Sequence, residues 1–386
     1  MQSFTFYNPT RIYFGENAID NLAVELQKYG KNILLAYGGG SIIKSGLYDK
    51  ITAICARCGK TVYEVGGIMP NPRTEKVYEG IEICKKKDID LILAVGGGSV
   101  IDCVKGMAAG AKTDRDFWEA FYIGKEECLA ATPIGTVLTL PATGSEMNSG
   151  SVVTKWDENL KTDYASDKLY PHFSILDPTY TYTLPRNQII YGAVDTLAHI
   201  FEQYFSLPDD GNPSDDIAEA LIKNVRDNLE TALANPTDYR ARSNIMWDST
   251  MALNRIIGCG KRQDWMSHNI EHALSGFYDI PHGAGLAIVV PNWMRRVRGV
   301  CLSRFVRFAV NVWQVNPAGK SDDEIALEGI QAVQDYFRKI GAPTTLKEVG
   351  IPADRIEEMA AKVEINKGGY RPLTREDVVE ILKSSL

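Results

Sequence analysis

The sequence predicts an α/β domain with a mostly parallel sheet, followed by an all-helical domain. From residue 32 to residue 95, short apolar runs alternate with longer segments of helical pattern, which is typical of βαβ units. Beyond about Gln188 the segments are long and helix-patterned, with scarcely any strand. The chain of 386 residues also exceeds what one hydrophobic core normally organises. We therefore expect two domains, residues 1–187 and residues 188–386, with a cleft between them.

The apolar runs and turn residues place the individual elements. Strands are expected at 32–37 and 61–67, then at 90–95, 136–146 and 151–156, the last two around a small-residue loop. Helices are expected after the first strand up to residue 57 and near 74–87, and Pro70-Asn71-Pro72 predicts the turn before the latter. In the second domain, helical patterns cover 192–205, 216–233 and 241–257.

The composition excludes several classes of protein. The formal charge of −7 disfavours nucleic acid and anionic membrane surfaces as partners. The chain has no run of eighteen apolar residues, and its first residues lack the form of a signal peptide. Seven irregularly spaced cysteines are typical of reduced thiols, so we expect a cytoplasmic protein. Cys55 and Cys58 form a C-x-x-C pair, but we assign them to a buried helix face because no second pair completes a zinc site.

Two glycine loops follow predicted strands. Glycines let the backbone come close to a phosphate, and the N-terminus of the next helix adds oriented N–H groups. In the loop Gly96 to Ser99, the run of glycines exceeds what a plain β-α turn requires, because each glycine costs chain entropy. We interpret this loop as a phosphate-binding segment of a Rossmann-like dinucleotide-binding domain, with Asp102 in the first turn of the helix. It matches neither G-x-G-x-x-G nor a Walker loop.

The earlier loop, Gly38 to Ser41, bears on cofactor choice. Enzymes selective for NAD usually place a carboxylate at the end of this strand to bind the ribose 2′-hydroxyl. Here glycines and a serine leave room and donors for a 2′-phosphate, although no arginine stands in the loop. The loop therefore favours NADP over NAD.

The histidines are concentrated in one region. The chain has five, and His268, His272 and His282 fall within fifteen residues, with His282 in an expected Pro-His-Gly turn. His268 and His272 are spaced i, i+4, as are Asp195 and His199 in an earlier helical segment, so each pair shares a helix face. One carboxylate with imidazoles makes a mixed oxygen and nitrogen site that suits Fe(II), Zn(II) or a similar divalent ion.

These residues also carry a family resemblance. GGGSVID, ATGSE, GAVDTLAH and HNIEHALSGFYDIPHGAGLAIVVP together resemble the iron-containing (group III) alcohol dehydrogenases, over essentially the whole chain. The branch that the sequence most resembles contains NADPH-dependent butanol dehydrogenases and broad aldehyde reductases. The resemblance implies a dehydroquinate synthase-like architecture, a homodimer, and metal ligation by Asp195, His199, His268 and His282. Iron is preferred over zinc only through the family.

The resemblance further implies which residues contact the cofactor, and that the dinucleotide lies along the cleft. His272 would stay off the metal and lie near substrate and nicotinamide. Family members that prefer NAD carry an acidic residue where Gly39 stands, which agrees with NADP. The residues assigned to the cofactor are Gly38, Gly39, Gly40, Ser41, Asn71, Gly97, Gly98, Ser99, Asp102, Thr139, Leu140, Thr143, Asn148, Lys161 and Tyr180.

The expected reaction is hydride transfer between NADP(H) and a small primary alcohol or aldehyde such as butanol or butanal. The ion would act as a Lewis acid, and His272 would relay a proton or serve only the structure. An alternative is a metal- and NAD-dependent sugar-phosphate dehydrogenase or lyase, as in the dehydroquinate synthases, which needs lysine and arginine for its anionic substrate. The apolar and aromatic neighbours Trp265, Met266, Phe277 and Tyr278 favour a small, weakly polar substrate instead. A non-catalytic protein that uses the metal for stability remains a third hypothesis.

Overall fold

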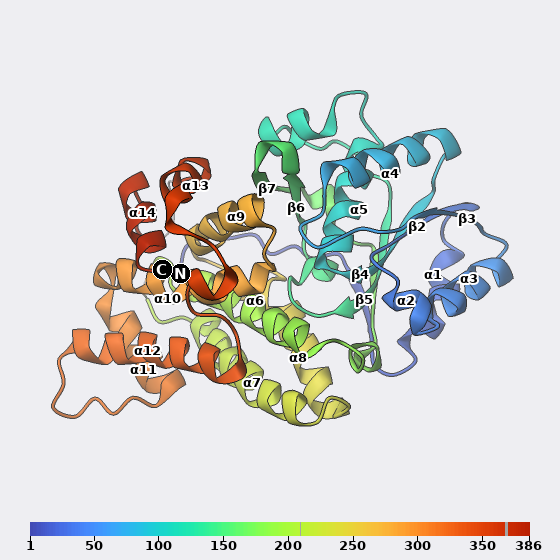
Figure 1. Cartoon of the computed structure of the whole chain (residues 1–386). Coiled ribbons are helices and arrows are strands. Elements are labelled where there is room, and N and C mark those ends of the chain that lie inside the picture. Colours follow the sequence, from blue (N-terminus) through green and yellow to red (C-terminus); the bar gives the residue numbers. More distant parts are fainter. Residues whose placement is uncertain (209, 367–369) are drawn as a thin grey trace. The chain divides into compact units, whose positions relative to one another are not determined.

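The computed structural model describes residues 1–208, 210–366 and 370–386. They form two compact units (Figure 1). The first, here called the α/β unit, is Tyr7–Leu184; the second, the helical unit, comprises Pro185–Leu386 together with Met1–Phe6. Within the described ranges, the helices lack the combination of length and apolarity that crossing a bilayer requires.

The α/β unit is built on a six-stranded sheet in the order β1-β8-β5-β4-β2-β3. Every neighbouring pair is parallel, which confirms the expectation of a parallel sheet. The strands are β1 (Arg11–Phe14), β2 (Asn32–Tyr37), β3 (Thr61–Val65), β4 (Leu91–Gly97), β5 (Ile134–Leu140) and β8 (Phe173–Leu176). In this order β3 lies on one side of β2, whereas β4 and then β5 lie on the other side. The direction in which successive strands are added therefore reverses between β2 and β4.

Helices cover the sheet because its inner strands β2, β4, β5 and β8 are buried along most of their length. Alternate side chains of β2 and β4, including Ile33, Leu35 and Leu93, form one core with α1 (Leu22–Leu26) and α3 (Leu47–Arg57). Helix α5 (Gly98–Gly110) packs on β4 and also on α4 (Thr74–Lys87). A separate antiparallel hairpin, β6 (Gly150–Lys155) with β7 (Leu160–Ala165), packs against α5.

The assignment of the C-x-x-C pair to a buried helix face is confirmed for Cys55, which is buried in α3. It is wrong for Cys58, which is half-buried and lies just past the last residue of this helix, at its C-cap. All seven cysteines are free thiols.

In its described residues the helical unit contains no strand, only an isolated bridge between Leu207 and Arg262. Side-chain caps start several helices: Asn212 with Asp215 and Ser321 with Glu324 form capping boxes. The helices are α6 (Arg186–Tyr204), α7 (Pro213–Ala234), α8 (Tyr239–Ala252), α9 (Met266–Tyr278), α10 (His282–Val297), α11 (Leu302–Trp313), α12 (Asp322–Ile340), α13 (Ile356–Lys362) and α14 (Arg375–Lys383).

Helix α10 packs against both α6 and α9. Two glycines permit this packing. A Cβ atom at Gly283 would stand 2.1 Å from the carbonyl oxygen of Tyr191 in α6, and one at Gly285 would stand 2.7 Å from the Cγ of Glu271 in α9. Both distances are shorter than real Cβ contacts, so only glycine lets the start of α10 come this close to its neighbours.

Candidate metal centre and cofactor segments

Three helices bring the predicted metal ligands to one carboxylate oxygen, Oδ1 of Asp195. The Nε2 atoms of His199, His282 and His268 lie 3.5, 3.6 and 3.9 Å from it. Ligand atoms of Asp195, His268 and His282 all lie within 4.8 Å of one another. Asp195 and His199 come from α6 and His268 from α9, as the i, i+4 spacing predicted. The expected turn at His282 is wrong: this residue is the first of α10, because Pro281 caps the helix.

Burial and electrostatics at this place favour a cation. Oδ1 of Asp195 and Nε2 of His268 are buried and have no hydrogen-bond partner in the described structure. Burial alone would raise the pKa of Asp195, but His199, His282 and His268 outweigh it and bring the pKa down to about 2. Burial likewise lowers the pKa of His268, while Asp195 and Glu202 raise it to about 9. These side chains therefore fit a divalent ion. Such an ion would bind the two atoms that lack a hydrogen-bond partner and would supply the positive charge.

His272 lies beside this group of residues. Its ring centroid is 5.7 Å from that of His282, and the residue is 9% exposed. Trp265, one of the expected apolar neighbours, packs its ring against His268 and His199 at 5.2 and 6.1 Å between centroids. Phe277 is buried, and the guanidinium of Arg355 lies over its ring at 4.5 Å. The remaining histidine, His172, belongs to the α/β unit, where its Nδ1 is 3.0 Å from the Tyr29 hydroxyl.

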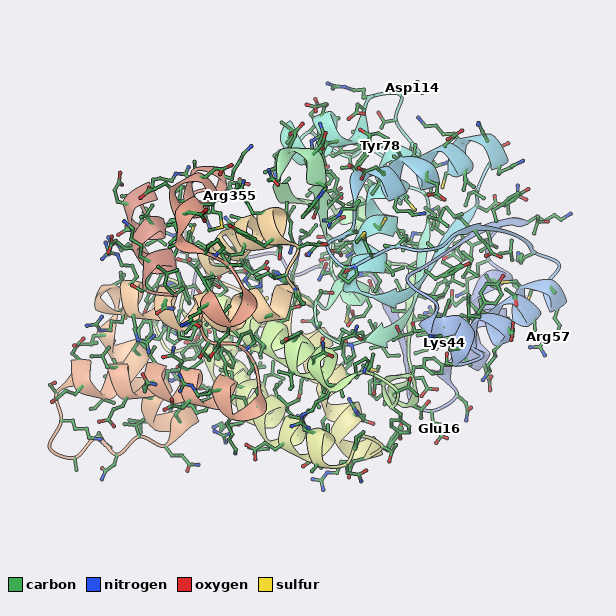
Figure 2. All side chains as sticks on the ribbon, in the orientation of Figure 1. Glu16, Lys44, Arg57, Tyr78, Asp114 and Arg355 are labelled. Atoms are coloured by element: carbon green, nitrogen blue, oxygen red, sulfur yellow. The ribbon has the colours of Figure 1, made fainter. Side chains whose placement is uncertain are left out.

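The two expected glycine loops lie next to each other in the α/β unit, at the carboxyl ends of β2 and β4. Tyr37 pairs with Val95, and the chain leaves β2 after Tyr37. The expected loop from Gly96 to Ser99 is wrong as a loop: β4 continues through Gly97, and α5 begins directly at Gly98. The ends of β2 and β4 are the point where the strand order reverses, and ligands of such sheets bind outside it. Cβ atoms at Gly39 and Gly40 would meet nothing within 4 Å. Lys44, on the same short helix as Ser41, is exposed (Figure 2).

Other assigned residues meet around the start of α5. A Cβ at Gly98 would stand 2.3 Å from the Thr143 side chain, and one at Gly97 would stand 3.1 Å from Leu140. Asn148 donates to the carbonyl of Thr143, and Lys161 donates to Oδ1 of Asn71 at 2.9 Å. Thr139 is half-buried at the end of β5, and Ser99 is half-buried in the first turn of α5. The Tyr180 hydroxyl is buried and has no hydrogen-bond partner in the described structure.

Asp102 has a different place from the one expected. Helix α5 begins at Gly98, so Asp102 lies beyond its first turn. It is buried, and its carboxylate accepts hydrogen bonds from the Ser145 hydroxyl at 2.5 Å and the Val152 amide at 3.0 Å. The fully buried Lys105 donates to Ser145, Asn148 and Gly150. Both side chains thus fasten the 145–152 segment to α5.

Comparison with known proteins identifies the family. Residues 9–178 match the model of the iron-containing alcohol dehydrogenases, and residues 189–386 match that of the C-terminal part of the Fe-containing alcohol dehydrogenase family. The chain belongs to the iron-containing alcohol dehydrogenases. This bears out the resemblance seen in the sequence and sets aside the dehydroquinate synthase-like lyase. The two matched segments together span nearly the whole dehydrogenase.

Individual relatives extend over the full chain. The dehydrogenase is 47% identical to probable NADH-dependent butanol dehydrogenase 1 of Bacillus subtilis, over 100% of both chains. It is 37% identical to the NADPH-dependent aldehyde reductase YqhD of Escherichia coli, over 94% of this chain and 93% of that one. The crystal structure of NADH-dependent butanol dehydrogenase A from Thermotoga maritima superposes with a TM-score of 0.96 at 41% identity, covering 100% of this chain and 99% of that one.

Three residues of the dehydrogenase escaped the sequence analysis: Lys105, Glu202 and Glu271. Glu202 and Glu271 contact the Nδ1 atoms of His268 and His282. The sequence held a signal for the two glutamates. Glu202 lies three residues after His199, and Glu271 lies three residues after His268, so each shares a helix face with a histidine.

Proposed function

We propose that this dehydrogenase reduces small aldehydes and oxidises the corresponding primary alcohols, butanal and butanol among them, with NADP(H) and one divalent metal ion. The observation that carries the proposal is the convergence of three imidazoles on Asp195 Oδ1, a buried oxygen that accepts no hydrogen bond from the described residues. The names of the relatives support the substrate class, since they include butanol dehydrogenases and an aldehyde reductase.

Asp195, His199, His268 and His282 would hold the ion. Iron and zinc both accept this set of one oxygen and three nitrogen ligands, and iron is proposed on the strength of the family. When bound, the ion supplies Lewis-acid chemistry toward the substrate oxygen. The side chain of Trp265 packs over two of the imidazoles and helps to exclude water from them.

His272 would hold or move a proton at one of its ring nitrogens. Three imidazoles already surround Asp195 Oδ1, and His272 lies beside His282 as a further imidazole. An imidazole has an ordinary pKa near 6.5, which suits proton transfer close to neutral pH. The nicotinamide cofactor would be bound by the α/β unit, through the glycine loops and the residues that meet at the start of α5.

The preference for NADP(H) rests on the loop at the end of β2. Gly39 and Gly40 leave open space there, Ser41 offers a hydroxyl, and Lys44 adds an exposed ammonium. The carboxylate on the neighbouring strand, Glu64, accepts hydrogen bonds from the Tyr37 and Tyr48 hydroxyls. The names of the relatives divide on this point: the Bacillus protein is called NADH-dependent and the Escherichia protein NADPH-dependent.

The proposal is tested with a panel of short aldehydes, each assayed with NADPH and with NADH, with and without added Fe(II) or Zn(II). We expect higher kcat/KM with NADPH, loss of turnover after chelation, and recovery on adding the ion. Replacing Asp195, His199, His268 or His282 by Ala should weaken metal binding, whereas His172→Ala should not. Full activity of metal-free His268→Ala would refute the metal-dependent mechanism, and a preference for NADH would refute only the choice of cofactor.

A further inference from the structure

Two fully buried carboxylates stand behind the proposed metal ligands. Glu202 follows His199 on α6, and its Oε1 lies 3.3 Å from Nδ1 of His268. Glu271 lies on α9, and its Oε2 pairs with Nδ1 of His282. In both rings the other nitrogen, Nε2, faces Oδ1 of Asp195. Each imidazole is therefore held between a carboxylate on one side and the proposed metal position on the other.

We propose that Glu202 and Glu271 are positioning residues that fix His268 and His282 for metal binding. The inference rests on the proposed metal site. A neutral imidazole carries one N–H and one lone pair, and a carboxylate can only accept a hydrogen bond. The carboxylates therefore favour the tautomer with the proton on Nδ1, which leaves the lone pair of Nε2 free to bind the ion. They also fix the planes of the two rings and make the imidazoles better donors.

Glu202 is held by the beginning of α9. Its Oε1 accepts from the Ser267 amide at 2.7 Å and the Ser267 hydroxyl at 2.5 Å, and its Oε2 accepts from the Trp265 amide at 2.8 Å. The His268 amide also donates to Oε1, at 3.2 Å. Three of these four donors are backbone N–H groups at the start of the helix, where amides otherwise lack partners. Glu202 thus connects α6 to the start of α9 and fixes the backbone of His268 as well as its ring.

Glu271 is held between α9 and α10. The Ser275 hydroxyl, one turn further along α9, donates to its Oε1. On the other side, the backbone of α10 at Gly285 leaves no room for a Cβ, which would stand 2.7 Å from Cγ and 2.8 Å from Oε1 of Glu271. His282, the partner of this carboxylate, begins the same helix. Glu271 therefore sets where the His282 ring lies relative to α9.

The test compares Glu271→Gln and Glu202→Gln with the wild type and with Asp248→Asn. Asp248 is the matched control, because it is a carboxylate of α8 that is 1% exposed and, among the residues that the structure describes, accepts from Asn224. Each protein is stripped of metal, and its affinity for Zn(II) and for Co(II) is measured by competition with a chromophoric chelator. The visible spectrum of the Co(II) form reports the coordination geometry, and the melting temperature of the metal-free protein reports the fold.

We expect Glu271→Gln and Glu202→Gln to bind Zn(II) about ten- to a hundredfold more weakly, as is typical for such partners of metal-binding histidines. Their Co(II) spectra should change, whereas Asp248→Asn should match the wild type in both measurements. Glu202 also supports the start of α9, so its replacement can weaken metal binding through the fold. The decisive variant is therefore Glu271→Gln, provided that its metal-free melting temperature equals that of the wild type.

Two results would overturn the inference in different ways. Zn(II) affinity of Glu271→Gln within twofold of the wild type, with an unchanged Co(II) spectrum, would show that the carboxylate does not position His282. A wild type that binds no ion, or an ion whose affinity is unaffected by Asp195→Ala, would refute the proposed metal site and the inference with it. Gly285→Ala provides a second variant, since it displaces Glu271 without removing its charge and should weaken Zn(II) binding in the same direction.

Discussion

Replacing Lys105 by Met tests how the α/β unit holds its proposed cofactor residues. The Lys105 ammonium is fully buried and donates to four acceptors: Ser145 Oγ at 2.8 Å, Asn148 O at 2.9 Å, Asn148 Oδ1 at 3.0 Å and Gly150 O at 2.7 Å. Burial lowers its pKa to about 8, against the opposing effect of Asp102 and Glu146, so the group is still charged at pH 7. Methionine has a similar length and no donor, so the variant removes the hydrogen bonds and the charge while retaining most of the volume.

The expected cost follows from what the substitution leaves behind. The carbonyls of Asn148 and Gly150 lose their donor, and the buried Asp102 loses the cation that most favours its charged form. Breaking a buried charge pair by removing one partner costs about 3–5 kcal/mol. We therefore expect Lys105→Met to lower the free energy of unfolding by about that amount. We also expect NADPH to bind about tenfold more weakly, because Thr143 and Asn148 are no longer held in position. A tenfold loss of affinity corresponds to about 1.4 kcal/mol.

The assay combines scanning calorimetry with fluorescence titration of NADPH in the absence of substrate. Lys112→Met is the control, because Lys112 is an exposed lysine just beyond α5, and surface substitutions of this kind change stability by about 0.5 kcal/mol or less. A Lys105→Met protein with the melting temperature and the NADPH affinity of the wild type would refute the conclusion that Lys105 holds the 145–152 segment.

Three further predictions concern single side chains. His272→Ala should keep its metal but lose rate by about ten- to a thousandfold, as judged by metal analysis and the pH–rate profile; loss of the metal would make His272 a ligand, and an unchanged rate would make it a bystander. Gly39→Asp should fit the open space at Gly39 and shift the ratio of kcat/KM from NADPH toward NADH by about ten- to a hundredfold, through repulsion of about 1–3 kcal/mol; an unchanged ratio would contradict it. Burial raises the pKa of Asp248 from 3.8 to about 7, against the opposing effect of the Asn224 hydrogen bond. Between these two values the folded protein keeps a proton on Asp248 that the unfolded chain has lost, so stability falls as the pH rises through this range. When the pH is raised from 5 to 8, the free energy of unfolding of Asp248→Asn should therefore increase by about 2–3 kcal/mol relative to that of the wild type. Unfolding measured for both proteins at each pH gives this difference, and a difference independent of pH would argue against the raised pKa.

The fold was predictable from the sequence where an apolar run was long enough to specify a strand alone. The expected strand at 32–37 coincides with β2, the expected helix near 74–87 coincides with α4, and those at 61–67 and 90–95 differ from β3 and β4 by one or two residues at their ends. The strand expected at 136–146 ends at Leu140, because Pro141 and the small residues after it cannot continue it. Strands β1, β7 and β8 were missed. The first and last have only four residues, and pairing with each other and with β5, not their own pattern, makes them strands.

The candidate site was predictable as a set of residue types but not as a geometry. The i, i+4 pairs gave the correct helix faces because helical periodicity is local. The role of Glu202 is not local: its donors belong to a helix start more than sixty residues later in the chain, and nothing in the spacing specifies that approach. Lys105 escaped for the same reason. A lysine in an apolar helix is ordinary until the 145–150 segment provides its acceptors.

The choice between iron and zinc is not made by the ligands themselves. One carboxylate and three imidazoles accept either ion, and divalent zinc generally binds such donors more tightly than Fe(II). The carboxylates behind two of the imidazoles, His268 and His282, would strengthen the bonds of these two ligands to either ion without distinguishing the ions, because they act through the imidazoles and not through the coordination number. Metal-free protein offered equal Fe(II) and Zn(II) under anaerobic conditions should therefore take up zinc, as metal analysis after gel filtration would show. Uptake of iron in this competition would mean that the packing of α6, α9 and α10 imposes a geometry that zinc does not accept, and the ligand set would then be an insufficient description of the site.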